Sequence, residues 1–186
     1  MRCFVAVDLD PSLIGKVTEL QKELAGLDTK LVEPENLHFT LKFLGEVDED
    51  TVNKVKSILK EVAGSQTPFS TDIAGVGVFP NNKFVRVVWL GERHSGNKPS
   101  LTNLQSIVNE ALSGLFKKEK SSAHLTLARV KSQTYQEEII EFLNRHKGIN
   151  LGMMKVNCIK LKKSTVTGKG PVYEDVEIFG IGKSSG

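Results

Sequence analysis

The segment NLHFTLKFLG, residues 36–45, is an apolar strand that carries a histidine and, two positions later, a threonine. Short runs of β-branched, aromatic and leucine residues that end at glycine are typical of β-strands. A second segment with nearly the same order, SAHLTLARV, follows at residues 122–130. A buried ionisable ring needs polar partners. Because both segments carry a histidine followed two positions later by a threonine, we infer that the two copies share a role.

Each copy is expected to set its histidine beside its threonine. Side chains alternate between the two faces of a strand, so His38 shares a face with Thr40, and His124 with Thr126. The same alternation places Lys42 on the His38 face. It assigns three apolar residues of the first copy to the core face: Phe39, Leu41 and Phe43. The two imidazole–hydroxyl pairs therefore point away from the hydrophobic core of their own half.

The rest of the sequence repeats one order of elements around these strands. The tripeptide PSL opens a predicted helix at residues 11–13 and again at 99–101. We predict an α+β fold, a bilobal pseudo-two-fold repeat with two mostly antiparallel sheets flanking a central cleft and helices on the outer faces. Residues 1–183 form one predicted domain of two interleaved lobes, and 184–186 a tail. Helices are predicted at 11–27, 49–64, 98–115 and 134–148, and Asp10 and Asp48 are predicted to cap the first two. Strands are predicted at 2–9, 36–44, 69–80, 83–92, 122–130, 154–166 and 172–181.

The chain has 186 residues, 39% of them hydrophobic and 25% charged, with a formal net charge of +3. This composition is typical of a folded globular protein and indicates neither disorder nor a dense basic surface. No apolar run approaches the roughly 20 residues needed to cross a bilayer, and the first residues lack the apolar core of a signal peptide. We therefore expect a cytoplasmic protein without membrane association. No motif indicates an oligomer, so we expect a monomer.

Two histidines that face one cleft can divide acid–base work. Imidazole titrates near pH ~6.5, so one ring can accept a proton while the other donates one. The threonine hydroxyls add neutral hydrogen-bond donors for a developing oxyanion. This equipment suits in-line displacement at phosphorus. His94, in a polar loop, and His146, near the end of the fourth helix, lack metal-ligand spacing, so we expect no metal and no other cofactor.

These segments resemble the 2H phosphoesterase superfamily, which is named for two His-x-Thr/Ser motifs. ENLHFTLKFLGEV at 35–47 and SAHLTLARV match the motifs, RCFVAVDL at 2–9 matches the family's opening, and FPNNKFVRVVWLG at 79–91 resembles the hairpin between them. Within the superfamily the chain resembles the bacterial and archaeal RNA 2',3'-cyclic phosphodiesterases, also called 2'-5' RNA ligases. The resemblance covers nearly the whole sequence.

The resemblance implies hydrolysis of a 2',3'-cyclic phosphate end of RNA or a nucleotide to a 2'-phosphate, in a site between two sheets. It implies that His38 donates a proton to the leaving 3'-oxygen and that His124 accepts one from the attacking water. Thr40 and Thr126 are then expected to bind the substrate phosphate. With a 5'-hydroxyl in place of water, the reverse reaction would join RNA ends by a 2'-5' bond without ATP.

Several alternatives stay open at this stage. Arg129 either clamps a phosphate, as the resemblance suggests, or lies on the core face, as strict alternation predicts. Lys42 either contacts the RNA backbone or is solvated. The alternative functions are an RNA-end binding module without catalysis, a two-lobed structural protein without a ligand, and a cyclic phosphodiesterase for another nucleotide such as ADP-ribose 1'',2''-cyclic phosphate.

Overall fold

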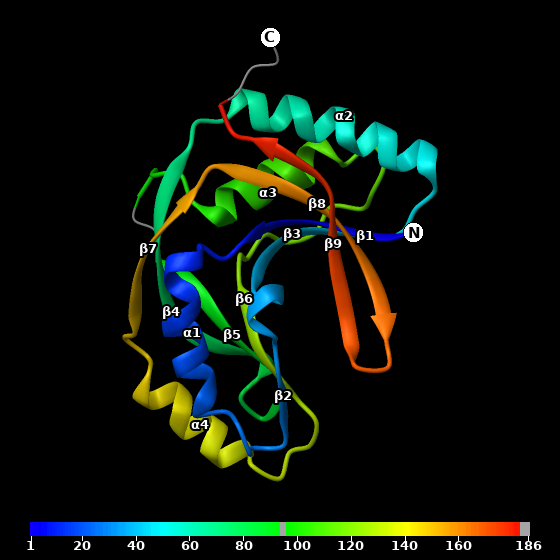
Figure 1. Cartoon of the computed structure of the whole chain (residues 1–186). Helices are drawn as coiled ribbons and strands as arrows, with labels where there is room; N and C mark the ends of the chain where they lie inside the picture. Colours follow the sequence, from blue (N-terminus) through cyan, green and yellow to red (C-terminus); the bar gives the residue numbers. More distant parts are fainter. Residues whose placement is uncertain (94–95, 183–186) are drawn as a thin grey trace.

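Figure 1 shows the computed structural model of the chain, which describes residues 1–93 and 96–182. The predicted loop residue His94 and the predicted tail at 184–186 lie outside them. The described residues form these elements in chain order: β1 Arg2–Asp8, α1 Pro11–Lys22, β2 Thr29–Leu31, the 3₁₀ helix η1 Pro34–Asn36, β3 His38–Glu46, α2 Glu49–Ser65, β4 Phe69–Asn81, β5 Phe84–Arg93, α3 Leu101–Ala111, β6 Leu125–Val130, α4 Gln136–Arg145, β7 Asn150–Val156, β8 Cys158–Thr167 and β9 Gly170–Gly180.

All of the described strand pairs are antiparallel, and hydrogen bonds connect the strands in the order β7-β4-β5-β6-β3-β1-β8-β9, with β2 added on β6. β3, β1, β8 and β9 form one lobe, and β6, β5, β4 and β7 form the other together with β2. The lobes meet where Phe39 of β3 pairs with Leu125 of β6. The structure thus confirms the α+β fold with two antiparallel halves and joins their sheets edge to edge at the motif strands.

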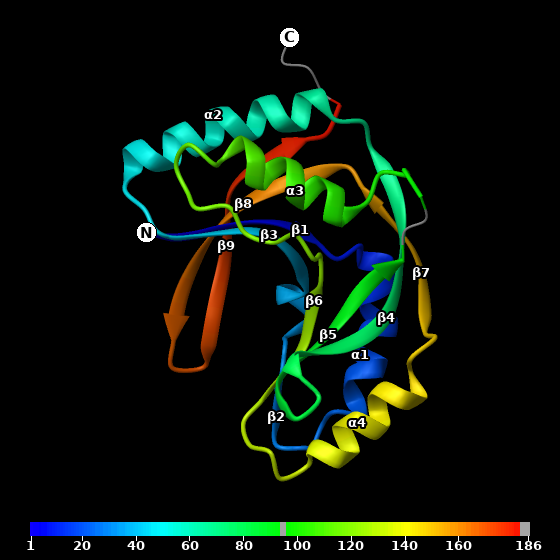
Figure 2. The same cartoon turned by 180° about the vertical axis from the view of Figure 1, so that it is seen from behind.

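The two lobes place their strands in matching order. Counting outward from the contact between the motif strands, β3-β1-β8-β9 corresponds to β6-β5-β4-β7. The helices cross between the lobes, because α1 follows β1 but packs on β6 and β7, whereas α3 follows β5 but packs on β3. α2 lies over β8 and β9 beside α3, and α4 lies next to α1 on the other lobe (Figures 1 and 2). Helices therefore cover the outer faces of both lobes, as predicted.

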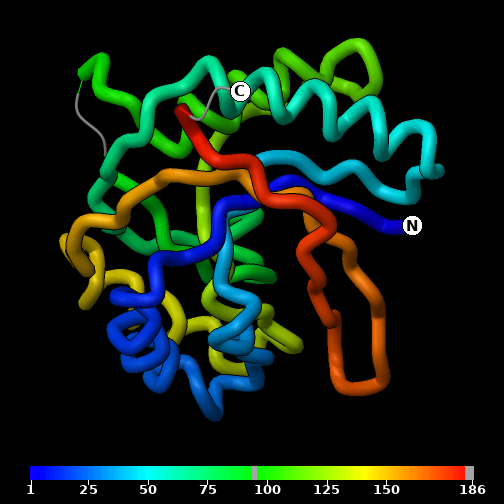
Figure 3. The backbone as a smooth tube through the Cα atoms, turned by 45° about the horizontal axis from the view of Figure 1, so that its top comes forward, coloured from blue at the N-terminus to red at the C-terminus, as the bar shows by residue number. Residues whose placement is uncertain are grey.

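Side-chain caps fix where several elements begin. Asp10 and Asp48 cap α1 and α2 as predicted, each accepting a backbone N–H within 2.9 Å. Ser100 caps α3, so this helix starts later than predicted. The sequence did not predict β2 or η1, and it merged β7 with β8, which Asn157 separates. A short turn joins the last two strands, β8 and β9, and Figure 3 shows their hairpin standing out from the body of the molecule.

The helices contribute apolar stripes to a continuous core. Val17 of α1, Val55 and Leu59 of α2, Val108 of α3 and Phe142 of α4 are completely buried against the sheet. The opposite faces of these helices are polar, as expected of helices that cover a sheet in water. None of the helices in the described part of the chain has the length and the hydropathy needed to cross a bilayer.

An extra residue interrupts the first motif strand directly after Thr40. In the ladder between β1 and β3, Val5 pairs with Lys42 and Ala6 pairs with Thr40, so Leu41 has no partner residue. Such a β-bulge reverses the alternation of side chains beyond it, because the two-residue period restarts one position later.

The second motif strand carries a bulge at the same place. In the ladder between β5 and β6, Val88 pairs with Ala128 and Trp89 pairs with Thr126, so Leu127 has no partner residue. Both bulges therefore follow directly after the threonine of a His-x-Thr motif, which extends the repeat from the sequence to the backbone.

The two bulges overturn the predicted faces of the residues beyond them. Phe43, predicted on the core face, is 63% exposed and lines the cleft, whereas Lys42, predicted beside His38, is 2% exposed. Arg129 stands at the position equivalent to Phe43 and also lines the cleft. Strict alternation would have buried both side chains.

Candidate active site

A cavity of about 450 Å³ lies between the two lobes. All of the site residues proposed from the sequence line it: His38, Thr40, His124, Thr126 and Arg129. The first two come from β3, the last two from β6, and His124 immediately precedes β6. The fold therefore brings both imidazole–hydroxyl pairs to one space from opposite lobes.

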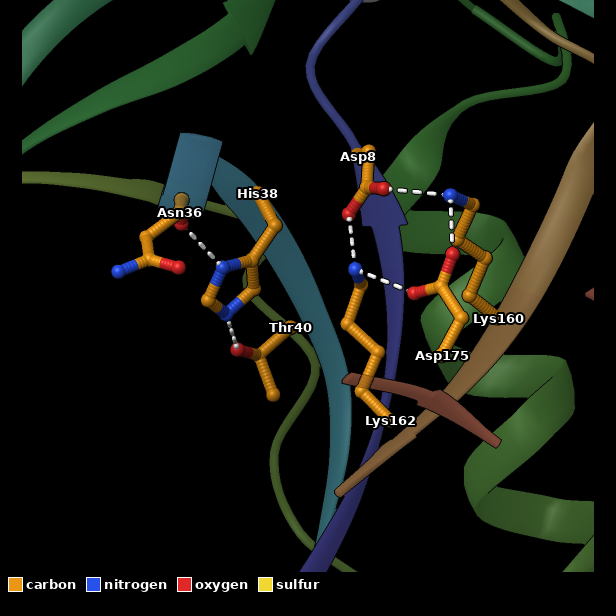
Figure 4. Close-up of polar contacts among 7 residues, drawn as sticks. All are labelled: Asp8, Asn36, His38, Thr40, Lys160, Lys162 and Asp175. Carbon is orange, nitrogen blue, oxygen red and sulfur yellow. Dashed lines mark hydrogen bonds and ion pairs between the residues drawn. The ribbon is translucent and has the colours of Figure 1, made fainter. Parts of the chain in front are cut away.

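His38 is oriented by two hydrogen bonds and packs against two aromatic rings. Its Nδ1 lies 2.6 Å from the backbone carbonyl of Asn36, and its Nε2 lies 3.0 Å from the hydroxyl of Thr40 (Figure 4). A carbonyl oxygen only accepts hydrogen bonds, so Nδ1 carries the hydrogen and Nε2 of the neutral ring accepts from the Thr40 hydroxyl. The rings of Phe4 and Tyr173 lie 5.0 and 5.4 Å from the imidazole, centroid to centroid.

His124 repeats the backbone part of this arrangement. Its Nδ1 lies 2.8 Å from the carbonyl of Ser122, two residues upstream, just as His38 contacts Asn36. The edge of the imidazole meets the ring of Phe79, with 4.8 Å between centroids. In both copies the upstream carbonyl fixes the proton on Nδ1 and leaves Nε2 for proton transfer.

A single side chain of α3 links the two motif strands. Gln105 donates from Nε2 to the carbonyl of Thr40 at 3.3 Å and accepts at Oε1 from the N–H of Ser122 at 2.8 Å. Because the Ser122 carbonyl orients His124, Gln105 connects the backbone of one motif to the histidine of the other.

The surroundings of His38 lower its pKa below the ordinary value of 6.5. The main cause is burial, which disfavours the charged ring, and the charges of Lys162 and Arg129 act in the same direction. The Asn36 carbonyl and the Asp8 carboxylate oppose the shift because both stabilise the imidazolium. The neutral ring is therefore favoured at neutral pH in the absence of substrate.

Four charged side chains form a closed cluster of ion pairs beside His38 (Figure 4). Lys160 lies 2.8 Å from Asp8 and 2.7 Å from Asp175, and Lys162 lies 3.0 Å from Asp8 and 2.7 Å from Asp175. Burial works against the charge of Lys160, but hydrogen bonds to Asp175 and Asp8 raise its pKa. Burial likewise opposes the charge of Asp175, and its hydrogen bonds with both lysines lower its pKa. The cluster ties β1, β8 and β9 together next to the cavity.

The cavity itself is positively charged. Four cationic residues line it, Arg2, Lys30, Arg129 and Lys169, against one carboxylate, Glu33. Within residues 1–93 and 96–182, none of the four cations forms an ion pair. Uncompensated cations around a cleft favour an anionic ligand such as a phosphate.

The hairpin of β8 and β9 borders the cavity at its tip. Lys30 on β2 donates to the carbonyl of Lys169 at 3.3 Å, and Asn36 on η1 donates to the carbonyl of Pro171 at 3.3 Å. The Gly-Lys-Gly segment at 168–170 forms the turn between β8 and β9, and Lys169 and Gly170 line the cavity together with Pro171.

Aromatic side chains line the same cavity beside His38. The rings of Phe4 and Phe43 lie 6.3 Å apart, and the ring of Tyr173 lies 4.9 Å from Phe4 in an edge-on contact. These residues were missing from the sequence-based site. Phe43 was assigned to the core because the bulge before it leaves no mark in the sequence pattern.

Lys42 takes neither of its two predicted roles. Its buried Nζ donates to the carbonyl of Lys117 and lies 3.5 Å from the carboxylate of Glu119. The bulge at Leu41 turns this side chain away from the cavity. Lys42 therefore pins the segment after α3 to β3 and is neither solvated nor in the cleft.

A bilobal fold that brings one His-x-Thr pair from each lobe into a single cavity is the arrangement implied by the resemblance to the 2H phosphoesterases. The sequence profile described as LigT like Phosphoesterase matches residues 7–89 and 95–173. The chain therefore belongs to the LigT-like phosphoesterase family and is an enzyme of the hydrolase class. No group of three or more His, Cys, Asp or Glu side chains suited to a metal ion occurs in the described part of the chain.

Individual relatives are similar in sequence to this chain over nearly their full length. The RNA 2',3'-cyclic phosphodiesterase of Archaeoglobus fulgidus is 43% identical over 182 residues, which cover 96% of this chain and 99% of that protein. The protein of the same name from Methanothermobacter thermautotrophicus is 38% identical, with 96% and 98% covered. Among solved structures, TT0787 of Thermus thermophilus superimposes with a TM-score of 0.81 at 26% identity, with 100% of both chains covered.

Proposed function

We propose that this protein hydrolyses 2',3'-cyclic phosphate ends of RNA or nucleotides to 2'-phosphates by general acid–base catalysis with two histidines. The observation that carries the proposal is the shared cavity, into which each lobe brings one His-x-Thr pair. The name RNA 2',3'-cyclic phosphodiesterase, borne by relatives that match nearly the whole chain, supports the choice of substrate.

In the proposed reaction one bond to phosphorus forms and another breaks. His124 accepts a proton at Nε2 from the attacking water, whose oxygen bonds to phosphorus. His38 donates a proton from Nε2 to the leaving 3'-oxygen, and the bond from phosphorus to that oxygen breaks. The order of the two roles follows the resemblance of the motifs. The Asn36 carbonyl stabilises the imidazolium of His38, because a hydrogen bond from the charged ring is stronger than one from the neutral ring. The Ser122 carbonyl accepts the Nδ1 hydrogen of His124.

The threonines and Arg129 are proposed to hold the phosphoryl oxygens. Hydroxyl and guanidinium donors fixed in advance favour the developing charge of the transition state without reorganisation. Arg129 is suited to this role because the bulge at Leu127 turns it into a cavity that also holds both histidines. Its charge contributes to lowering the pKa of His38 in the free protein.

Binding of the substrate is proposed to load His38 with its proton. The phosphodiester brings a negative charge to the cavity, and an opposite charge nearby raises the pKa of an imidazole. This charge opposes the effects of burial and of Arg129, so that His38 becomes the proton donor only when the cyclic phosphate is present.

The exposed ring of Phe43 is proposed to support the base of the terminal nucleotide. A flat aromatic face offers stacking to any base, at roughly 1–3 kcal/mol per base. Phe43 is suited because it is 63% exposed and lines the cavity on the His38 side.

Running the same steps backwards, with a 5'-hydroxyl in place of the water, would join two RNA ends by a 2'-5' bond without ATP.

The proposal is tested by incubating the purified protein in EDTA with an oligoribonucleotide that ends in a 2',3'-cyclic phosphate and, separately, with ADP-ribose 1'',2''-cyclic phosphate. We expect the oligoribonucleotide to gain a 2'-phosphate end, identified by chromatography against authentic 2'- and 3'-phosphate standards. Tight binding without product would indicate an RNA-end binding module. Turnover confined to the ADP-ribose compound would move the activity to another nucleotide, and a 3'-phosphate product would contradict the proposed leaving group.

A further inference from the structure

Two buried side-chain amides donate hydrogen bonds to backbone carbonyls at the two bulges. Gln21 of α1 is 3% exposed, and its Nε2 donates to the carbonyl of Leu127 at 2.8 Å and to that of Val32 at 2.9 Å. Asn109 of α3 is 4% exposed, and its Nδ2 donates to the carbonyl of Gln105 in the same helix at 3.0 Å and to that of Leu41 at 3.4 Å. In each lobe, one accepting carbonyl belongs to the unpaired residue that directly follows the motif threonine.

These contacts have a physical reason. A bulge interrupts the regular ladder at a buried residue, Leu41 or Leu127, and each amide supplies a hydrogen bond to the carbonyl there. The Leu127 carbonyl also accepts the backbone N–H of Val32 at 3.0 Å, so the Gln21 amide is its second donor. An amide in the core is itself costly unless it is paired, and these contacts offset part of that cost.

The arrangement repeats across the pseudo-two-fold axis. α1 and α3 are equivalent helices of the two rounds, and each crosses to the lobe whose motif strand it contacts. Each bulge lies two positions before the residue that it turns into the cavity, Phe43 after Leu41 and Arg129 after Leu127. The same backbone device therefore supplies an aromatic ring to one side of the cavity and a guanidinium to the other.

We propose that Gln21 and Asn109 are positioning residues for the reaction, because their amides hold the two bulges and thereby aim Arg129 and Phe43 into the cavity. The inference rests on the proposed function for its catalytic consequence but not for its structural one. Neither amide lines the cavity, so both act through the residues that they aim.

The test replaces each amide with an apolar side chain of similar volume, Gln21→Met and Asn109→Leu. We expect Gln21→Met to lower kcat/KM about 10-fold, within the roughly 10²-fold that a displacement of 1 Å can cost. In an Arg129→Ala background the same change should lower kcat/KM less than about twofold, because its target is already gone. Asn109→Leu should show the same dependence on Phe43→Ala.

Matched controls separate positioning from general weakening of the fold. Val17→Ala and Val108→Ala remove completely buried apolar side chains from the same two helices and leave both amides in place. They should lower the melting temperature but leave kcat/KM of the folded protein within about twofold of the wild type. An equal loss in Gln21→Met with and without Arg129, or no loss at all, would overturn the inference.

A crystal structure of Gln21→Met tests the inference even if the wild type proves inactive. We expect Leu127 to enter the ladder and Arg129 to turn out of the cavity. If Arg129 keeps its place, Gln21 does not position it, whatever the protein catalyses. Absence of turnover in the wild type, by contrast, would count against the proposed function alone.

Discussion

The two motif strands share their backbone and differ in what surrounds it. Each has a histidine tied to an upstream carbonyl, a threonine two positions later and a bulge directly after it. Around His38 lie Phe4, Tyr173 and an ion-pair cluster, whereas His124 makes an edge-on contact with Phe79. A duplicated scaffold thus sets the same backbone geometry on both sides, and the two rings differ in their neighbours.

The largest expected effect comes from removing either ring. His38→Ala and His124→Ala should each lower turnover of a cyclic phosphate at least ~10²-fold, the low end for loss of a general acid or base. Steady-state kinetics on a nucleoside 2',3'-cyclic phosphate measures this, and circular dichroism shows whether each variant is folded. Near-normal turnover in either folded variant would break the assignment of two complementary roles.

The equivalent positions beyond the bulges should differ in what they recognise. Arg129→Ala should lower kcat/KM roughly 10-fold or more, since a hydrogen bond to a charged group is worth about 1.5–3 kcal/mol. Phe43→Ala should lose about as much on a nucleotide through lost stacking.

Ribose 2',3'-cyclic phosphate, which has no base, separates the two. On this compound Phe43→Ala should match the wild type, whereas Arg129→Ala should remain impaired. If Phe43→Ala is equally impaired with and without a base, the ring has a structural role and the proposed base contact is wrong.

The smallest expected effect concerns the pKa of His38. As a proton donor His38 acts only when protonated, so kcat/KM falls as the pH rises through its pKa, which lies below 6.5 in the free protein. Asp8 raises that pKa, so Asp8→Asn should move this limb of the profile to still lower pH.

Asp175→Asn is the matched control, because it removes the other carboxylate of the same cluster. We expect Asp175→Asn to leave this limb of the pH profile nearly in place. NMR titration of the His38 ring should likewise show a lower pKa in Asp8→Asn and a nearly unchanged pKa in Asp175→Asn. An equal movement in both variants would assign the effect to collapse of the cluster and not to the charge of Asp8.

The sequence predicted what depends on local pattern. The lobes, the shared cleft and the four polar site residues were predicted from three local features: alternation around His38 and His124, the repeated PSL tripeptide, and the caps at Asp10 and Asp48. These features depend on residues that are close in sequence, or on one motif compared with another.

What the sequence did not predict depends on partners that lie far along the chain. The bulges at Leu41 and Leu127 arise from the register against β1 and β5, so neither Phe43 nor Lys42 was placed correctly. The cluster beside His38 joins Asp8 to residues of β8 and β9 more than a hundred positions later. The periodicity of the local sequence carries no sign of such long-range contacts.

The crossing of α1 and α3 between lobes has a consequence for folding. A fragment that ends after β5 would carry α1 but not β6 and β7, which that helix covers, and it would leave β3 without α3. We therefore expect that neither round of the repeat folds on its own. Two such fragments should acquire native structure only when mixed, much as subunits do when they exchange a helix.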